Sequence, residues 1–228
     1  MGAVAFFDLD RTLLAVNSAT LWLREEVRGG NVRPLEALKA LGWLARYSLG
    51  SADMEDAMIA TIATLEGRNE REVAARTESF YERVVRGQVR PGGRAAIEAH
   101  RAKGDAVVLL TSSSRYLSSL FARDLGLDDF LCTLVEVDAQ GLFTGRPIGR
   151  PCFGAGKVDA ANAFLATRGV SLADCTFYTD SASDVPMLEV VGRPVAVSPD
   201  PRLARIARAR GWPVLDWGKP VAATAPVA

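Results

Sequence analysis

The chain has 228 residues, with 27 basic side chains, 27 acidic side chains and a single histidine, His100. A formal charge of zero provides no overall field that would draw the protein onto nucleic acid or an anionic membrane. One histidine excludes a multi-histidine zinc site, and a histidine-based triad would depend on His100 alone. Lysine is rare, with four residues against 23 arginines. We therefore expect catalysis to depend on carboxylates, hydroxyls and one of the few lysines.

The length fits one domain, or one domain with an inserted subdomain. The three cysteines, Cys132, Cys152 and Cys175, are odd in number and widely spaced, and they match neither a zinc pattern nor a disulfide framework. A reducing compartment suits this usage. The sequence shows no signal peptide and no run of about 20 apolar residues that would span a bilayer. We therefore predict a cytoplasmic protein without an integral membrane segment.

The first 88 residues divide into a strand and a helical region. Residues 3–7 are wholly apolar, which indicates a buried strand. Residues 15–88 then read as almost entirely helical, with an amphipathic stripe over 35–47 after Pro34 and further helices over 54–64 and 70–86. No strand pattern interrupts them. The pattern predicts a separate bundle of four helices.

From residue 89 onwards, strands and helices alternate. Strands are predicted at 106–110, 131–135, 176–178, 194–197 and 214–216, and helices at 95–103, 116–125 and 156–168, with a hairpin near 141–148. Such alternation implies a parallel sheet covered on both faces. We predict an α/β protein with a Rossmann-like parallel sheet and an inserted helical cap. The predicted division is a core of residues 1–14 and 89–218, a cap of 15–88 and a flexible tail of 219–228.

Polar clusters follow the predicted strands at their carboxyl ends, where ligands bind in open parallel sheets. Converging carboxylates need a hard divalent cation such as Mg²⁺, which prefers oxygen ligands. Hydroxyls at the start of a helix favour an anion, and one lysine adds a point charge for a phosphate oxygen. The pattern therefore predicts a phosphoryl-transfer site. Its candidate residues are Asp8, Asp10, Thr111, Ser112, Lys157, Asp180 and Asp184.

Each of these features also has an ordinary structural explanation. Paired aspartates after a strand are often only a turn, and hydroxyls before a helix are often only an N-cap. A lone lysine is usually a solvated surface residue. The joint occurrence of these features, in this order and at these strand ends, favours the functional interpretation.

Four segments resemble the motifs of the haloacid dehalogenase-like phosphohydrolase superfamily. FFDLDRTLL resembles the first motif, LLTSS the second, Lys157 the third and YTDSASDVPML the fourth. The stretch DAQGLFTGRPIGRPCFGAGK is similar to the hairpin and the approach to the lysine in the branch that includes phosphoserine phosphatase. This branch carries a helical cap between the first and second motifs. The resemblance covers residues 3–15 and 90–200.

The resemblance implies a phosphatase mechanism with two catalytic aspartates. Asp8 is the implied nucleophile, which divides a difficult displacement into two easier steps through an aspartyl-phosphate. Asp10 is the implied general acid and base. An aspartate two positions after the nucleophile also distinguishes phosphatases and phosphotransferases from dehalogenases and transport ATPases.

The resemblance also implies how the remaining motif residues act. The implied Mg²⁺ ligands are the Asp8 carboxylate, the Asp10 backbone carbonyl and Asp180, with Asp184 supporting the metal shell or orienting Lys157. Thr111, the Ser112 N–H and Lys157 would hold the phosphoryl oxygens, because phosphoryl transfer needs mainly positioning and charge neutralisation.

The sequence departs from phosphoserine phosphatases where they recognise the substrate amine. Those enzymes have a glutamate at the position of Asn17, and Gly and Asn at the positions of Ser181 and Ser183. We therefore expect specificity to come from the cap, although an aromatic residue at helical spacing belongs to the core more often than to a ligand pocket. The candidate specificity residues are Asn17, Ser18, Trp22 and Arg46.

The leading prediction is a Mg²⁺-dependent phosphatase for a small phosphorylated metabolite, similar to phosphoserine phosphatase or histidinol-phosphatase. The alternatives are a lipid head-group phosphatase at the membrane surface, a phosphotransferase and a non-enzymatic regulator on the same fold. We expect no nucleic-acid partner, and the sequence leaves the oligomeric state open.

Overall fold

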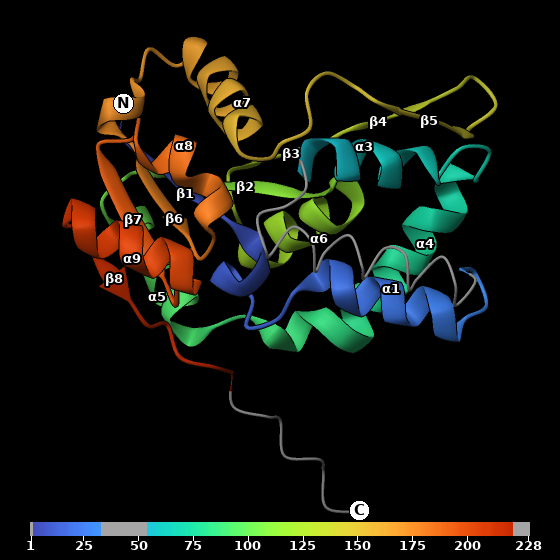
Figure 1. The fold of residues 1–228 in the computed structure, drawn as a ribbon, viewed down its shortest axis with the longest axis horizontal. Coiled ribbons are helices and arrows are strands. Elements are labelled where there is room, and N and C mark those ends of the chain that lie inside the picture. Colours follow the sequence, from blue (N-terminus) through green and yellow to red (C-terminus); the bar gives the residue numbers. More distant parts are fainter. Residues whose placement is uncertain (1, 33–53, 221–228) are drawn as a thin grey trace, which may run out of the picture.

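The computed structural model describes residues 2–32 and 54–220, and its core is a six-stranded sheet in which all neighbouring strands are parallel (Figure 1). The strand order is β3-β2-β1-β6-β7-β8. The strands are β1 (Val4–Phe7), β2 (Ala106–Ser114), β3 (Asp129–Thr133), β6 (Thr176–Thr179), β7 (Arg193–Val197) and β8 (Val214–Leu215).

The register places the carboxyl ends of the central strands side by side. Phe7 of β1 is opposite Leu109 of β2 on one side and Tyr178 of β6 on the other. The residues that follow these three strands therefore meet at one edge of the sheet. We refer to this edge as the catalytic edge.

Helices cover both faces of the sheet, as the α/β prediction requires. Ala5 and Phe7 belong to the core cluster that contains residues of α5 (Pro91–Ala102) and α6 (Arg115–Leu125). Val4 and Phe6 belong to the cluster on the other face, because successive strand side chains point to opposite faces. That face is covered by α7 (Ala155–Ala166), α8 (Val185–Leu188) and α9 (Pro201–Arg210). The predicted fold class is confirmed.

The segment between β1 and α5 contains the helices α1 (Ser18–Arg28), α3 (Met54–Ala63) and α4 (Glu70–Phe80). A π-helical turn, η2 (Tyr81–Val85), and a 3₁₀ turn, η3 (Arg86–Gln88), continue from α4 to the core. Asn17 and Asn69 cap α1 and α4 through their side-chain oxygens, in agreement with the preference of asparagine for N-caps. The predicted stripe over 35–47 lies outside the described residues. The domain boundaries stay predictions.

The helical segment is joined to the core at more than its two chain links. The links run side by side, with Ala15 N–H donating to Gln88 O at 2.9 Å and Arg90 N–H donating to Leu13 O at 2.8 Å. The hairpin of β4 (Val135–Val137) and β5 (Phe143–Pro147) adds a further connection, since Gly67 N–H donates to Phe143 O at 2.8 Å. Any cap movement must therefore carry this hairpin along or break its bonds.

Several boundaries differ from the sequence prediction for physical reasons. α5 begins at Pro91, four residues before the predicted start, because proline is well suited to the first turn of a helix. β3 begins at Asp129, two residues before the apolar run, because it is a half-buried edge strand. Within the described ranges, none of the helices has the length and apolar character needed to cross a bilayer.

Candidate active site

The first motif forms a tight turn directly after β1. The Asp8 N–H continues the sheet by donating to Tyr178 O at 2.9 Å, and the chain then enters η1 (Leu9–Leu13). Asp10 is extended, at φ −67° and ψ 130°, and Arg11 takes the left-handed conformation at φ 57°. This conformation is uncommon for a residue with a side chain. The turn therefore places both motif aspartates at the catalytic edge.

Lys157 joins two of the predicted carboxylates in the interior. Its Nζ lies 2.7 Å from Asp8 Oδ1 and 2.7 Å from Asp184 Oδ2, and the residue is 2% exposed. It projects from the first turn of α7, which lies close to the preceding loop. A Cβ atom on Gly156 would stand 2.0 Å from Pro151 O, so only glycine fits immediately before the lysine.

The fourth motif supplies two buried aspartates after β6. Asp184 Oδ2 accepts a hydrogen bond from Thr179 Oγ1 at 2.6 Å in addition to the bond from Lys157. Asp184 Oδ1 is buried and has no hydrogen-bond partner among the described residues. Asp180 Oδ1 accepts from Thr12 Oγ1 at 3.4 Å, and the same hydroxyl lies 3.4 Å from Asp8 Oδ2. Thr12 therefore bridges the first and fourth motifs.

Burial raises the pKa values of three carboxylates at this edge, those of Asp8, Asp10 and Asp180. Burial is the main cause at Asp8, whose pKa is raised to about 7 despite the opposing charge of Lys157. Burial, followed by the neighbouring Asp8 charge, raises the pKa of Asp180 to about 8. Burial also raises the pKa of Asp10. For Lys157, burial alone would lower the pKa, but Asp184 and Asp8 outweigh it and raise the pKa.

These charges leave an excess of negative charge in the interior when all the acids are ionised. Asp8, Asp180 and Asp184 are buried and face one buried ammonium group, that of Lys157. In the described ranges, no group of three or more His, Cys, Asp or Glu side chains has metal-binding geometry. The Mg²⁺ ligands that the resemblance implies are only two carboxylates, those of Asp8 and Asp180, and the backbone carbonyl of Asp10, so they would not form a group of three such side chains. The charge excess and the unpartnered Asp184 oxygen fit a divalent cation.

The second motif lies at the same edge, on the strand next to β1. Thr111 is buried, two residues beyond Leu109, which is opposite Phe7. Its Oγ1 accepts a hydrogen bond from Ser113 N–H at 3.2 Å. Ser112 is half-buried, and α6 begins three residues later. Thr111 and Ser112 therefore lie near the carboxyl end of β2, shortly before α6 begins, whereas Lys157 comes from α7.

The structure assigns a structural contact to each described residue that was predicted to set specificity. Asn17 Oδ1 accepts from Thr20 N at 2.9 Å and from Thr20 Oγ1 at 2.8 Å, so it caps α1. The Ser18 N–H donates to Asp10 Oδ1 at 2.7 Å. Trp22 packs edge-to-face on Phe80, with ring centroids 5.3 Å apart. Asn17 and Trp22 are thus engaged within the helical segment, and Arg46 lies outside the described residues.

Two threonines contribute to the site although the sequence predicted no role for them. Thr12 and Thr179 are fully buried, and their hydroxyls bind the motif aspartates. Both lie inside the quoted motif stretches, but they have no periodic or charge signal of their own. Only the pairing of β1 with β6 brings Thr12 and Asp180, 168 positions apart, into contact.

Comparison with known proteins identifies the family. The model of the haloacid dehalogenase-like hydrolases matches residues 5–189. A phosphoserine phosphatase from Mycobacterium tuberculosis is 35% identical over 219 residues, which cover 94% of this chain and 71% of that protein. A histidinol-phosphatase from Neisseria meningitidis is 30% identical over 221 residues, which cover 95% of this chain and 100% of that protein. The chain belongs to the haloacid dehalogenase-like hydrolase family.

The solved structures agree with this assignment. A protein of unknown function from Bordetella pertussis Tohama I superposes with a TM-score of 0.86 at 35% identity, covering 96% of this chain and 100% of that chain. A phospho-aspartyl intermediate analogue of phosphoserine phosphatase superposes with a TM-score of 0.69 at 15% identity, covering 96% of this chain and 94% of that chain. The second likeness shows the fold. The predicted family and the prediction of a hydrolase of the phosphatase class are confirmed.

Proposed function

We propose that the protein is a Mg²⁺-dependent phosphomonoesterase that forms an aspartyl-phosphate on Asp8. One observation carries the proposal: a buried lysine is held between the first-motif and fourth-motif aspartates at 2.7 Å from each. A buried ammonium group beside two carboxylates has a fixed position, and the cluster lies at the catalytic edge, where β1 and β6 end. This arrangement suits a substrate phosphate better than it suits stability alone.

In the first step, an Asp8 carboxylate oxygen attacks phosphorus and the bond from phosphorus to the leaving oxygen breaks. Asp10 donates its proton to that oxygen, so the product leaves as an alcohol. The raised pKa of Asp10 supports this role, because an acid must hold its proton near neutral pH. Lys157, Thr111 and the Ser112 N–H would hold the phosphoryl oxygens.

In the second step, water attacks the aspartyl-phosphate and Asp10 takes the proton that the water loses. Phosphate leaves and the Asp8 carboxylate is restored. The Ser18 N–H bond to Asp10 Oδ1 supports both steps, since it fixes the carboxylate in one orientation. Ser18 is thus proposed as a positioning residue at the start of the helical segment.

The cation would be held by Asp8, Asp180 and the Asp10 carbonyl, with Asp184 nearby. When bound, it supplies positive charge that keeps both carboxylates ionised and neutralises the phosphoryl oxygens. The raised pKa values of Asp8 and Asp180 support this assignment, because they indicate a site short of positive charge.

The proposed substrate is a small phosphorylated metabolite of the kind that histidinol-phosphatase and phosphoserine phosphatase act on. Of the two, phosphoserine lacks one expected partner, because residue 17 is an asparagine whose side-chain oxygen is used as the cap of α1. A carboxylate for the substrate ammonium group is therefore missing at that position. Histidinol phosphate, other amino alcohol phosphates and sugar phosphates are the first compounds to test. A cytoplasmic location stays a prediction.

A phosphotransferase reaction would use the same residues with an alcohol in place of water. Among the described residues, nothing at the catalytic edge favours an acceptor over water, so hydrolysis is the simpler proposal. A lipid head-group phosphatase would also use this site. It would differ from a phosphatase for a small metabolite only in the substrate.

The test is a phosphate-release assay over a panel of phosphomonoesters, with Mg²⁺ and with a chelator. The panel includes phosphoserine, histidinol phosphate, sugar phosphates and phosphatidylglycerol phosphate. We expect Mg²⁺-dependent release from one class and an acid-stable phosphoryl label that Asp8→Asn abolishes. Turnover by pure Asp8→Asn protein at the wild-type rate would refute the mechanism. Transfer of the label to an added alcohol would identify a phosphotransferase.

A further inference from the structure

The zero net charge of the chain conceals an uneven distribution. Residues 193–219 contain six basic and two acidic side chains, whereas the rest of the chain contains 21 basic and 25 acidic ones. The excess is concentrated on α9 (Pro201–Arg210), which has four arginines and no acidic residue. The C-terminal part of the core therefore carries a local positive charge that the overall sum hides.

Three of the four arginines of α9 lack acidic partners, whereas the fourth, Arg210, pairs with Glu189 at 2.6 Å. Arg202, Arg205 and Arg208 are exposed, and none has an ion pair with another described residue. We call these three residues the α9 arginine stripe. Elsewhere, Arg86 pairs with Glu82 at 2.8 Å, and Arg146 pairs with Glu136 at 2.9 Å. The stripe is thus a surface of uncompensated positive charge.

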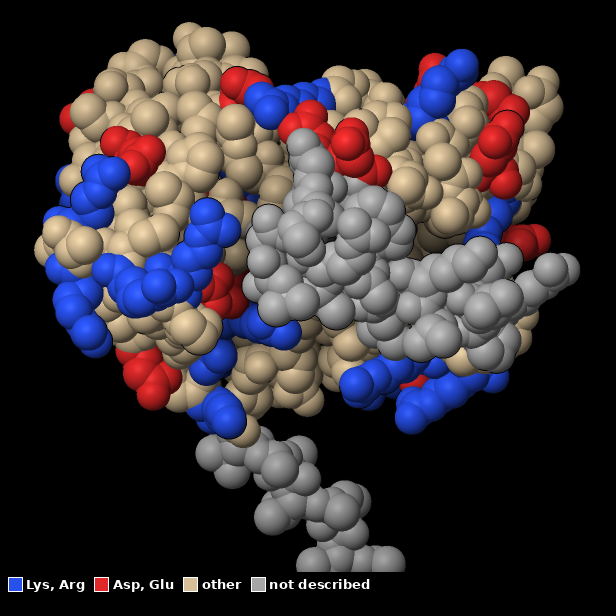
Figure 2. Space-filling model, in the orientation of Figure 1, with Lys and Arg blue, Asp and Glu red and all other residues tan. Residues whose placement is uncertain are grey.

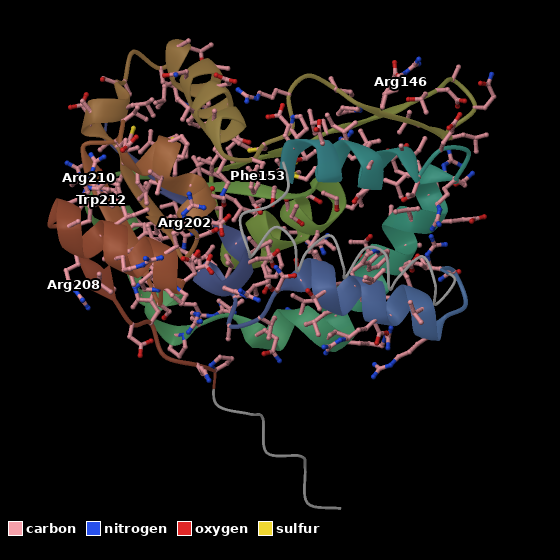
Figure 3. The ribbon with its side chains drawn as sticks, viewed as in Figure 1. Arg146, Phe153, Arg202, Arg208, Arg210 and Trp212 are labelled. Carbon is pink, nitrogen blue, oxygen red and sulfur yellow. The ribbon has the colours of Figure 1, made fainter. Side chains whose placement is uncertain are left out.

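The spacing of the stripe follows from the helix. Its arginines recur every third residue, which places them about 4.5 Å apart along the axis and on neighbouring sides. Leu203 and Ala207 are fully buried, so the opposite face holds α9 against the sheet. Figure 2 shows basic side chains gathered on the α9 side of the molecule. In Figure 3, Arg202 lies at the end towards the centre and Arg208 at the outer end.

Apolar side chains lie beside the outer end of the stripe. Arg210 stands over the ring of Trp212, with 5.9 Å from the guanidinium carbon to the ring centroid (Figure 3). The next residues form the edge strand β8, where Val214 is 54% exposed and Leu215 is 41% exposed. An aromatic ring and exposed aliphatic groups next to arginines are the composition of a membrane-surface contact.

We propose that this surface, the α9 arginine stripe with Trp212, Val214 and Leu215, docks the protein on an anionic lipid membrane. Arginines bind lipid phosphates, and the exposed aliphatic groups gain an apolar environment that water does not provide. A second copy of the chain fits poorly, because two such stripes would repel each other. Nucleic acid would bind the arginines but would leave the aliphatic groups of β8 unused.

The stripe begins close to the catalytic edge. Asp200, the N-cap of α9, donates its backbone N–H to Asp180 O at 2.8 Å and accepts from Ala182 N–H at 2.8 Å. Docking through α9 therefore holds the fourth motif close to the lipid surface. The proposal concerns where the protein docks and makes no claim about its substrate, so it stands or falls independently of the proposed phosphatase activity.

The test is vesicle co-sedimentation with the full chain. We expect sedimentation with vesicles of mixed phosphatidylglycerol and phosphatidylcholine, loss of binding at high salt, and no sedimentation with pure phosphatidylcholine. Replacing Arg202, Arg205 and Arg208 by glutamine should weaken binding by about a hundredfold, since each arginine near an anionic surface contributes about a fivefold change in affinity. Val214→Asn should weaken it by a smaller factor.

A matched control separates the stripe from general charge effects. Replacing Arg24, Arg71 and Arg123 by glutamine removes the same charge from exposed positions on α1, α4 and α6, and it should leave sedimentation unchanged. Circular dichroism spectra that match the wild type show that both triple variants fold. Equal loss of binding in the control, equal binding to neutral vesicles, or binding to RNA without binding to vesicles would each overturn the proposal.

Discussion

Two clusters of buried charge in this molecule differ in how the charges balance. In the cap, Glu26 is 4% exposed and faces Arg76 at 3.2 Å and Arg68 at 3.7 Å, with the Asn31 amide donating at 3.2 Å. At the catalytic edge, three buried aspartates face the one ammonium group of Lys157. The first cluster satisfies its carboxylate with protein groups. The second has more carboxylates than protein cations.

The difference separates a structural cluster from a functional one. Burying an ionised group is costly unless it is paired, so a cluster kept only for stability should approach balance. An excess of carboxylate that remains in the interior indicates a missing cation or a proton held at neutral pH. The two clusters therefore predict opposite responses to neutralising substitutions.

The largest expected effect is on turnover in Asp8→Asn. The substitution removes the nucleophile, and we expect kcat to fall by about three orders of magnitude or more. It also removes one buried negative charge, so the melting temperature should stay the same or rise. Steady-state kinetics and thermal unfolding measure the two effects. A lower melting temperature would show that the carboxylate is a structural partner of Lys157, as Glu26 is of its arginines.

Lys157→Met should reduce both turnover and stability. Methionine fills the space but leaves Asp8 and Asp184 without their cation, and breaking a buried pair in this way typically costs about 3–5 kcal/mol. The double variant Lys157→Met, Asp184→Asn should recover part of the stability and none of the turnover. Chemical denaturation measures the difference. Equal stability of the single and double variants would contradict the charge-excess argument.

Mg²⁺ should stabilise the protein more at pH 8 than at pH 6. In the folded protein, the pKa values of Asp8 and Asp180 are raised to about 7 and 8, so both hold protons that the unfolded chain releases near pH 4. Without metal, the free energy of unfolding therefore falls as the pH rises through this range. A cation that binds the ionised groups should offset the loss. Thermal unfolding with and without Mg²⁺ at each pH measures this, and a pH-independent gain would count against it.

Glu26→Gln should destabilise the protein without changing the chemistry. Arg68 and Arg76 would lose their carboxylate but are about 30% exposed, so we expect a cost of about 1–3 kcal/mol. The kcat of the folded variant should stay within twofold of wild type. Unfolding curves and kinetics test both statements. A variant that is as stable as wild type but slower would place Glu26 in the function of the cap.

The smallest expected effect is that of Asn17→Ala. Loss of an N-cap typically costs about 1 kcal/mol, and the relative kcat/KM values over the substrate panel should not change. Asn17→Asp keeps the cap and serves as the control. A change in substrate preference in Asn17→Ala alone would show that this side chain contacts the substrate after all.

The core elements could be predicted because their signals are local. Runs of three to five mostly apolar residues predicted β1, β6 and β7 closely, and the aspartate motifs followed β1 and β6 directly in the chain. The first residues of α5 and β3 were predicted less closely. The glycine-rich first turn of α5 and the half-buried edge position of β3 both blur the periodicity of the sequence.

His100 illustrates what only packing decides. The sequence shows only that it is the single histidine of the chain. In the fold it is buried, with Nδ1 at 2.8 Å from Asp105 Oδ2 and Nε2 at 2.9 Å from the hydroxyl of Tyr178. The backbone carbonyl of the same tyrosine accepts the Asp8 N–H. The single histidine thus supports the strand next to the nucleophile and has no role in the proposed chemistry.

The sequence by itself determined the fold class, the family and the carboxylates at the strand ends, because these depend on local periodicity and on motifs of fixed spacing. The tertiary structure decided the contacts between distant segments: the Thr12 bridge to Asp180, the seating of Lys157 between two aspartates, and the use of Asn17 as a cap. It also decided that a chain of zero net charge carries an unpaired arginine stripe on α9. Charges add along a sequence regardless of position, whereas the interactions between them depend on distance and burial.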